Sequence, residues 1–355
     1  MKKVMAALLA AGCCLSLCGC GRQAQEEDGR LKVVTTLFPY YDFARAIAGD
    51  SIDLTLLLPA GREVHSFEPT PLDAVTLSKA DVFLYNGGES ELWVEEMLHA
   101  AGEHIAVAAC MMDHVALHEE EFVEGMQGAH DHSHGEEAHE EAEDCADPTH
   151  DHEEAKQEDD AHAEDAADAH AGHDHDDVGY DEHIWTAPEN AIVLCRAVCE
   201  ALCDADEENA ALYRENCEAY CAEIAALDAD FRALREGARR TTLIFADRFP
   251  LLYFCESYDL GYRAAFHGCA SDTEPSLATL KYLIDRVESE NIPVVYTVDL
   301  SSEKIAEVIS ECTGADIARL WSLQTVSRED FAAGETYITM MRRNLAALEG
   351  GLYGP

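Results

Sequence analysis

Short apolar runs alternate with amphipathic stretches along most of the chain. In the first part, the apolar runs are as long as typical strands, and helical periodicity follows the first three of them. We expect strands at 31–37, 54–58, 82–85 and 105–110, and helices at 40–48, 72–79 and 93–99. Strands that are apolar at successive positions and separated by helices predict a parallel sheet covered on both faces.

The same alternation returns in the second part, after two longer helical stretches. The helices are expected at 188–203 and 206–237, and the second has an apolar stripe close to helical spacing. Beyond them we expect strands at 242–246, 294–298 and 317–323, and helices at 276–291, 304–312 and 335–348. The sequence therefore predicts an α/β protein with an N-terminal lobe at 31–187, linking helices at 188–239 and a C-terminal lobe at 240–355.

Residues 118–182 interrupt this alternation. From Glu119 to Glu182 there are 26 acidic residues against one basic residue, a net charge of −25 out of −47 for the chain. The segment has almost no large apolar residues, so we expect a disordered loop. Its histidines are His130, His132, His134, His139, His150, His152, His162, His170, His173 and His175. The acidity of the whole chain excludes nucleic acid and anionic membrane surfaces as partners, because both are polyanions.

The N-terminus reads as a targeting segment. Lys2 and Lys3 precede an apolar run that ends at Cys18, which is too short to span a membrane but suits a signal peptide. Residues 17–20, Leu-Cys-Gly-Cys, resemble a bacterial lipobox. We expect a lipoprotein signal peptide at 1–19, lipidation at Cys20 and a polar tether at 20–30. The protein would then be extracytoplasmic and anchored to the cell membrane by lipid. An uncleaved leader is the alternative.

Cysteines recur every four residues in the two linking helices. Cys195, Cys199 and Cys203 share one face of the first helix, and Cys217 and Cys221 share one face of the second. Disulfides between the helices and a cysteine-rich metal cluster both remain open from the sequence.

Polar donors follow three of the predicted elements. His65 lies in the loop after the second strand, His183 follows the acidic segment, and Asp247 ends the first strand of the second lobe. Ligands of open parallel sheets bind at the carboxyl ends of the strands. Each residue alone has an ordinary structural explanation, and their joint placement across two lobes suggests a shared site.

Three motifs carry a family resemblance. Residues 61–71, Gly-Arg-Glu-Val-His-Ser-Phe-Glu-Pro-Thr-Pro, residues 181–185, Asp-Glu-His-Ile-Trp, and residues 337–345, Tyr-Ile-Thr-Met-Met-Arg-Arg-Asn-Leu, occur in this order. They resemble the zinc- and manganese-specific solute-binding proteins of bacterial ABC transporters, the ZnuA-like family. Glu182 stands where that family's motif has proline. The resemblance implies two Rossmann-like lobes with parallel sheets, joined by a long rigid helix, and one metal ion in the cleft.

The resemblance also implies the metal ligands. The family's first two histidines fall on His65 and His183, and its third ligand falls on Asp247. The family's usual fourth ligand, an Asp near the end of the chain, is missing from residues 320–323. Further candidates for the missing donor are Glu63, His267, Glu274 and Asp299.

The identity of the metal depends on two opposing signals. Two imidazoles and a carboxylate suit Zn²⁺, whereas the carboxylate at Asp247 leaves Mn²⁺ open. The histidine-rich loop favours zinc, because neutral imidazole is a good zinc ligand and a poor manganese ligand. We expect this loop to collect zinc near the cleft.

The predicted function is high-affinity zinc binding outside the cytoplasm, with delivery to the permease and ATPase of an ABC importer. A manganese-binding protein of the same importer class is one alternative, and a surface adhesin or zinc-storage lipoprotein is another. A hydrolase is disfavoured, because the sequence has no His-Glu-x-x-His, Gly-x-Ser-x-Gly or phosphate-loop motif.

Overall fold

The computed structural model describes residues 29–64, 66–126, 179–268 and 274–354. The predicted signal peptide, Cys20, His65 and the ten histidines of the acidic segment lie outside the described residues.

The N-terminal lobe contains a four-stranded parallel sheet in the order β2-β1-β3-β4. Its strands are β1 (Leu31–Thr35), β2 (Ile52–Leu56), β3 (Val82–Tyr85) and β4 (Val107–Cys110), and its helices are α2 (Phe38–Ala48), α3 (Pro71–Leu77) and α4 (Trp93–Ala101). Short 3₁₀ turns occupy Gly49–Ser51, Glu89–Glu91, Gly102–His104, Met111–His114 and Ile184–Thr186. All seven elements predicted from the sequence are present, with ends that differ by a few residues.

The C-terminal lobe contains a second four-stranded parallel sheet, in the order β6-β5-β7-β8. Its strands are β5 (Thr242–Phe249), β6 (Gly261–His267), β7 (Val294–Val298) and β8 (Asp316–Leu320). Its helices are α7 (Leu252–Ser257), α8 (Leu277–Glu290), α9 (Lys304–Thr313), α10 (Arg328–Ala333) and α11 (Tyr337–Tyr353). The sequence patterns did not predict β6, α7 or α10.

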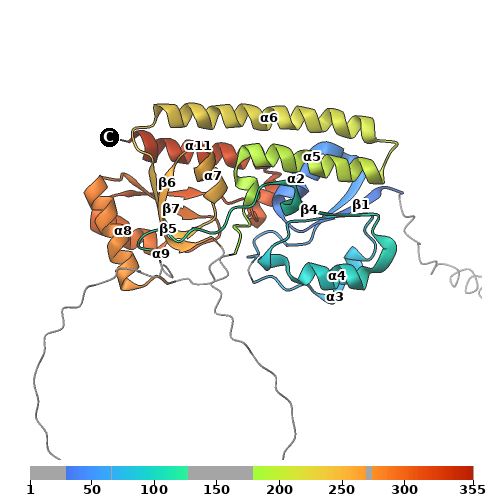
Figure 1. Cartoon of the computed structure of the whole chain (residues 1–355), viewed down its shortest axis with the longest axis horizontal. Coiled ribbons are helices and arrows are strands. Elements are labelled where there is room, and N and C mark those ends of the chain that lie inside the picture. The colour runs from blue at the N-terminus through green and yellow to red at the C-terminus, as the bar shows by residue number, and fades with distance from the viewer. Residues whose placement is uncertain (1–28, 65, 127–178, 269–273, 355) are drawn as a thin grey trace, which may run out of the picture.

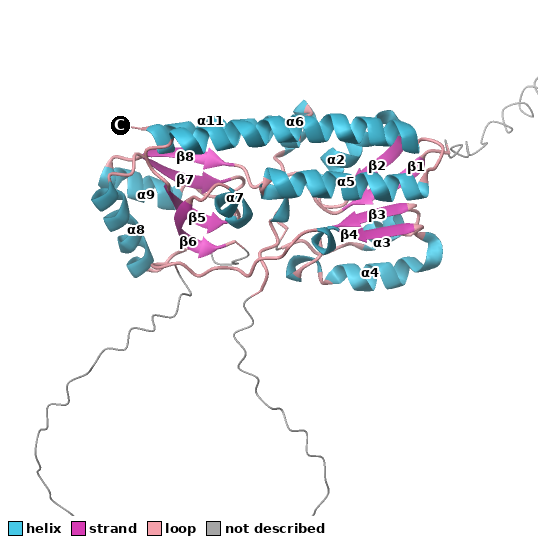
Figure 2. Cartoon of the chain, turned by 45° about the horizontal axis from the view of Figure 1, so that its top comes forward, coloured by secondary structure: helices cyan, strands magenta, loops and turns pink. Residues whose placement is uncertain are grey.

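Two helices connect the lobes, as Figure 1 shows. α5 (Pro188–Ala205) leads through a short turn into α6 (Ala210–Gly237), which has 28 residues and a length of about 42 Å. α6 packs on α5, on α2 of the N-terminal lobe and on α11 of the C-terminal lobe. The two sheets lie end to end beneath this pair of helices (Figure 2). The prediction of two Rossmann-like lobes joined by a long helix is confirmed.

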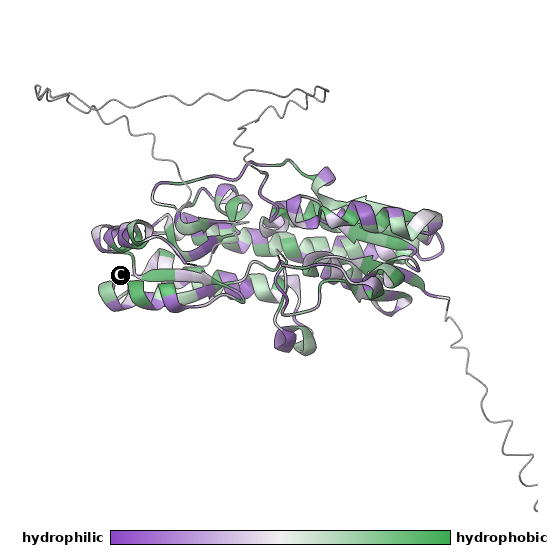
Figure 3. Cartoon of the chain, turned by 90° about the horizontal axis from the view of Figure 1, so that it is seen from below, coloured by the Kyte–Doolittle hydropathy of each residue, from purple (hydrophilic) through white to green (hydrophobic). Residues whose placement is uncertain are grey.

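The lobes share one core. The largest hydrophobic cluster includes Phe43 of α2, Trp185 before α5 and Tyr337 of α11, all fully buried. Trp185 Nε1 donates to the Ser322 carbonyl at 2.7 Å, and Tyr337 Oη donates to the Trp185 carbonyl at 2.9 Å. Figure 3 shows both lobes from below, with hydrophilic and hydrophobic residues mixed along the outer helices. No helix among the described residues is long and apolar enough to cross a membrane.

The two ends of the acidic segment are ordered, so the loop predicted at 118–182 is too wide. Glu119 and Tyr180 form an antiparallel bridge. The Glu120 amide donates to the Gly179 carbonyl at 2.9 Å, and the Asp181 amide donates to the His118 carbonyl, also at 2.9 Å. We call residues 118–126 and 179–182 the stem.

The stem packs on the C-terminal lobe. Tyr253 Oη accepts from the His118 amide at 3.1 Å and donates to the Asp181 carbonyl at 3.0 Å, so one side chain holds both ends. Glu124 pairs with Arg286 at 2.9 Å. Composition could not show these contacts, since they depend on residues far along the chain.

Candidate metal centre

His183 lies at the junction between the lobes. It follows the stem and precedes the 3₁₀ turn Ile184–Thr186, which Trp185 anchors in the core. The His183 residue is 1% exposed. Its ring is therefore held by buried neighbours and has little freedom to rotate.

Asp181 lies beside the ring of this histidine. Its Oδ1 accepts from the His183 backbone amide at 2.8 Å and lies 3.2 Å from His183 Nδ1. A carboxylate that accepts from one ring nitrogen and directs the other toward a metal ion is usual beside metal-binding histidines. Burial alone would lower the pKa of His183, but Asp181 beside the ring raises it above its ordinary value.

A small cavity adjoins this ring. His183, Glu63, Asp299, Ser322 and Gln324 are among the residues that line it, and its volume is about 20 Å³. On this measure, a cavity needs a volume of about 10–15 Å³ to hold one water molecule. The cavity therefore has room for one ion or one water molecule.

Asp299 brings a carboxylate to the same cavity from the end of β7. The Ser322 amide donates to Asp299 Oδ1 at 2.5 Å, and the Ser322 hydroxyl donates to Oδ2 at 3.4 Å. Burial raises the pKa of Asp299 to about 6. A cation in the cavity would offset the free energy of holding this carboxylate buried and charged.

Asp247 lies in a neighbouring hollow. β5 continues past the predicted end, through Phe249, with an irregular register between Phe245 and Arg248. Asp247 Oδ1 accepts from the Arg248 amide at 2.8 Å and Oδ2 from the Val298 amide at 3.4 Å. Burial raises its pKa. The two carboxylates thus stand at the ends of adjacent strands, with Asp299 rather than Asp247 lining the cavity beside His183.

Glu63 borders both spaces, and Glu274 lines only the hollow of Asp247. Glu63 pairs with Arg248 at 3.1 Å, so this carboxylate has a cationic partner from the other lobe. His267 points elsewhere: its Nδ1 lies 2.5 Å from Glu120 of the stem, and its ring packs on Phe122. In this structure His267 therefore serves to hold the stem.

The loop that contains position 65 is fixed at both of its ends. The Gly61 amide donates to the Val326 carbonyl of the C-terminal lobe at 2.7 Å, and Val64 is buried. At the other end, Thr70 caps α3 in a reciprocal capping box with Asp73. This loop and His183 come from opposite ends of the N-terminal lobe's sequence.

Comparison with known proteins identifies the family. The profile of "Zinc-uptake complex component A periplasmic", ZnuA, matches residues 33–351. The chain belongs to this family.

Relatives with curated names agree with this assignment. The ZnuA-family chain is 29% identical over 356 residues to the high-affinity zinc uptake system protein ZnuA of Bacillus subtilis, covering 99% of this chain and 98% of that protein. It is also 29% identical to the zinc-binding lipoprotein AdcA of Streptococcus pneumoniae over 98% of this chain, although it spans only 61% of that protein's length. These relatives are uptake and binding proteins, so the family is one of solute-binding proteins rather than enzymes.

Solved structures show the same fold. The metal-dependent lipoprotein YcdH of Bacillus subtilis superposes with a TM-score of 0.68 at 26% identity, over 91% of this chain and 100% of that one. The Zn(II)-bound ZnuA-like domain of Streptococcus pneumoniae AdcA gives a TM-score of 0.66 at 24% identity, over 91% and 99% of the chains.

This family member differs from the motif at Glu182, and the structure gives the difference a role. Glu182 is 2% exposed, and its Oε1 accepts from the Ser90 amide at 2.9 Å. Asn86 Nδ2 donates to the Glu182 carbonyl at 3.0 Å. Glu182 therefore joins the segment of His183 to the turn after β3. The sequence signal for this contact was a Glu at the position where the family's motif has Pro.

Proposed function

We propose that this protein binds one zinc ion in the cavity beside His183, outside the cytoplasm, and delivers it to an ABC importer. The observation that carries the proposal is the oriented His183–Asp181 pair next to the Asp299 carboxylate in a cavity of ionic size. Membership of the zinc-uptake family supports the same conclusion.

We assign His183 Nε2 and the Asp299 carboxylate as ligands, with His65 as a further ligand from the motif resemblance. Asp247, predicted as the third ligand, is the alternative carboxylate, since it lies on the strand next to that of Asp299. Glu63 is the weaker candidate because Arg248 already pairs with it. Glu274 shares only the hollow of Asp247, and His267 pairs with Glu120.

Zinc is favoured over manganese by the donor chemistry. Imidazole nitrogen with few carboxylate oxygens suits Zn²⁺, while Mn²⁺ prefers a larger set of oxygen donors. The ten histidines at 127–178 would add weak zinc sites, and the second strand of the stem leads from residue 179 through Asp181 directly to His183. We propose that this segment collects zinc for the cavity.

Three parts of the proposal concern the cell. Lipidation at Cys20 would hold the protein at the outer face of the membrane, and the permease and ATPase of the importer would be its partners. The shared core and the α6 connection imply that zinc release involves small movements of the lobes rather than a wide hinge opening.

Metal analysis of the purified chain with residues 127–178 replaced by a short Gly-Ser linker tests the cavity alone. We expect one tightly bound zinc ion per chain, and a loss of at least tenfold in zinc affinity in His183→Ala. The matched control is His99→Ala on the exposed face of α4, which should bind zinc like the parent chain.

Competition between Zn²⁺ and Mn²⁺ in the same protein decides between the two metals. Tighter binding of manganese would contradict the zinc assignment. Asp299→Asn and Asp247→Asn, measured side by side, decide which carboxylate is the ligand, and equal zinc affinity in Asp299→Asn and the parent chain would remove Asp299 from the site. Growth of zinc-starved cells that express each variant tests delivery.

A further inference from the structure

Five cysteines face one another between the two linking helices. Cys195, Cys199 and Cys203 are on α5, and Cys217 and Cys221 are on α6. All five are buried and have free thiols. Nothing in the proposed zinc site uses them.

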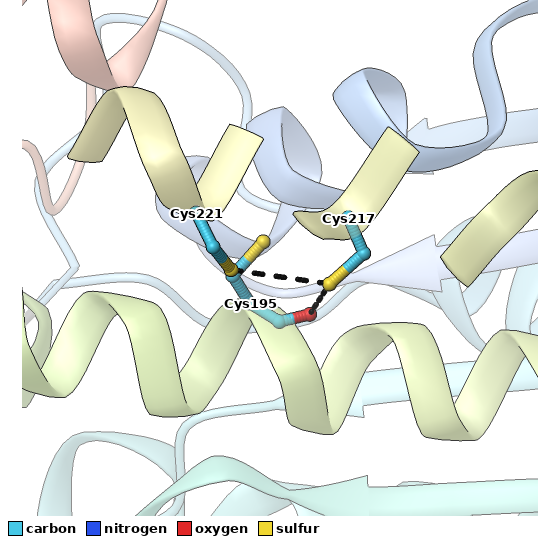
Figure 4. A group of neighbouring side chains, drawn as sticks. All are labelled: Cys195, Cys217 and Cys221. Carbon is cyan, nitrogen blue, oxygen red and sulfur yellow. Dashed lines mark hydrogen bonds between the residues drawn. The ribbon is translucent and has the colours of Figure 1, made fainter. Parts of the chain in front are cut away.

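Three of these thiols form a compact group, as Figure 4 shows. The Sγ atoms of Cys195, Cys217 and Cys221 all lie within 4.8 Å of one another. Cys217 Sγ and Cys221 Sγ are 3.9 Å apart. Two thiolates bound at about 2.3 Å to one ion have sulfurs roughly 3.8 Å apart at the tetrahedral angle and roughly 4.0 Å apart at the trigonal angle. The spacing therefore matches sulfurs that share an ion, with little rearrangement of the helices.

Hydrogen bonds also link the group. Cys217 Sγ donates to the Cys195 carbonyl at 3.7 Å, and the side chains of Cys195 and Cys217 lower the pKa of the Cys221 thiol, which favours its thiolate. Arg196 at the surface of α5 adds a positive charge that favours the same anion. A metal ion would take the place of the protons that the thiols share.

A recess at the surface reaches one thiol of the group, that of Cys217. It is lined by Cys199, Cys203 and Cys217 together with charged residues of both helices, and its volume is about 320 Å³. Cys199 lies between Cys195 and Cys203 on α5, four residues from each. The Sγ atoms of Cys199 and Cys203 are 3.9 Å apart. The sulfur atoms thus extend from the recess toward the buried group.

We propose that Cys195, Cys217 and Cys221 form a three-sulfur site for a soft monovalent ion, Cu⁺, separate from the zinc cavity. Soft thiolate donors select Cu⁺, and three sulfurs complete a trigonal shell for that ion. Structural zinc sites are closed by four donors, and the described residues bring together only three in this group. Each thiol that becomes a ligand releases its proton, and no change of oxidation state is needed when copper arrives as Cu⁺.

Anaerobic titration of the mature chain with Cu⁺, in competition with a coloured Cu⁺ chelator, tests the site. We expect the parent chain to bind one more equivalent of Cu⁺ than the triple variant described below, with an all-sulfur shell for that equivalent by X-ray absorption. Its affinity should fall at least tenfold in the triple variant Cys195→Ser, Cys217→Ser, Cys221→Ser. Because the histidine-rich segment is present in every variant, its own copper binding cancels in this comparison.

Two matched variants and a fold check complete the experiment. Cys312→Ser removes an exposed thiol of α9 and should leave Cu⁺ binding unchanged, as should His183→Ala. If circular dichroism shows that the triple variant does not fold, Cys217→Ser alone is measured. The proposal is overturned by equal Cu⁺ affinity in parent and folded variant, by disulfides between α5 and α6 in the native chain, or by zinc rather than copper at these sulfurs.

Discussion

The Asp181 carboxylate lies beside the ring of the candidate ligand His183, where it orients the ring and adds a negative charge. Replacing Asp181 by Asn keeps an acceptor for Nδ1–H but removes the negative charge. We expect the zinc affinity of Asp181→Asn to fall roughly 10- to 100-fold, as for other carboxylates that support metal-bound histidines. Isothermal titration with a zinc chelator as competitor measures the change.

Glu182→Gln is the matched control for that variant. Its side chain is equally buried, and its Oε1 accepts from the Ser90 amide. An equal loss of affinity in both variants would show that general disturbance of the segment, rather than the Asp181 contact, causes the effect.

Glu91 gives the fold a measurable pH dependence. Burial raises its pKa from 4.5 to about 7, although its Oε2 accepts from the Gly87 amide. Between these two pH values the folded state binds more protons than the unfolded state, so stability falls as pH rises. The loss is up to about 3 kcal/mol, at 1.36 kcal/mol for each pH unit.

Urea unfolding of the parent chain and Glu91→Gln at pH 5 and pH 8 tests this. The stability of the parent chain relative to Glu91→Gln should decrease between the two pH values. Glu95→Gln, at an exposed position of α4, controls for the loss of one charge. Parallel pH curves for the parent chain and Glu91→Gln would contradict the assignment.

At the scale of single residues, the sequence could predict only part of the candidate metal site. The motif around His183 is local in the sequence, so the sequence alone could predict a residue that lines the small cavity. The sequence prediction favoured Asp247 over Asp299, and no local pattern could separate the two, because each was expected directly after a buried strand. Which side chain reaches the cavity depends on the irregular register of β5, and no local pattern encodes that register.

At the scale of elements, central strands were predicted and an edge strand was missed. β7 is continuously apolar and buried along its length, and its predicted bounds are correct. β6 lies at the edge of its sheet and contains Arg263, whose side chain bonds to Tyr282 of α8 at 3.0 Å. Such a strand gains its conformation from pairing with β5, so its own sequence gave a weak signal.

The turn between β3 and α4 depends on a glycine that admits Glu182. Gly88 has φ +84°, and a Cβ there would lie 2.4 Å from Glu182 Oε1. Gly88→Ala should therefore destabilise the fold by the cost of a strained backbone, of order 1–3 kcal/mol, and additionally displace the Glu182 carboxylate. Thermal unfolding measures the change.

Gly102→Ala supplies the matched comparison. Gly102 has φ +74°, in the same backbone region, but a Cβ there meets nothing within 4 Å. The extra destabilisation of Gly88→Ala over Gly102→Ala isolates the contact with Glu182. Equal effects of the two substitutions would mean that the glutamate moves aside freely.

At the scale of the whole molecule, the lobes act as one body with a tethered insert. Joining residues 126 and 179 by a short Gly-Ser linker should change the free energy of unfolding by less than about 1 to 2 kcal/mol, because closure entropy varies only with the logarithm of loop length. Zinc affinity of the cavity should stay the same, while uptake by zinc-starved cells should fall.

Unfolding curves, zinc titration and growth measure these three outcomes on one variant. Unchanged uptake would remove the collecting role from the histidine-rich segment and leave the cavity assignment intact. A large loss of stability would show instead that the segment packs on the lobes.

The two hydrogen bonds of Tyr253 Oη bear on which parts of the sequence can change in length. Because one hydroxyl joins the chain at His118 and at Asp181, the folded body meets the insert at two fixed points. The described contacts of the stem with the lobe end at residues 126 and 179. We therefore expect that insert length and histidine number can change by duplication or deletion between those two residues without adjustment of the metal cavity, and that the same position accepts a grafted domain or a fluorescent reporter.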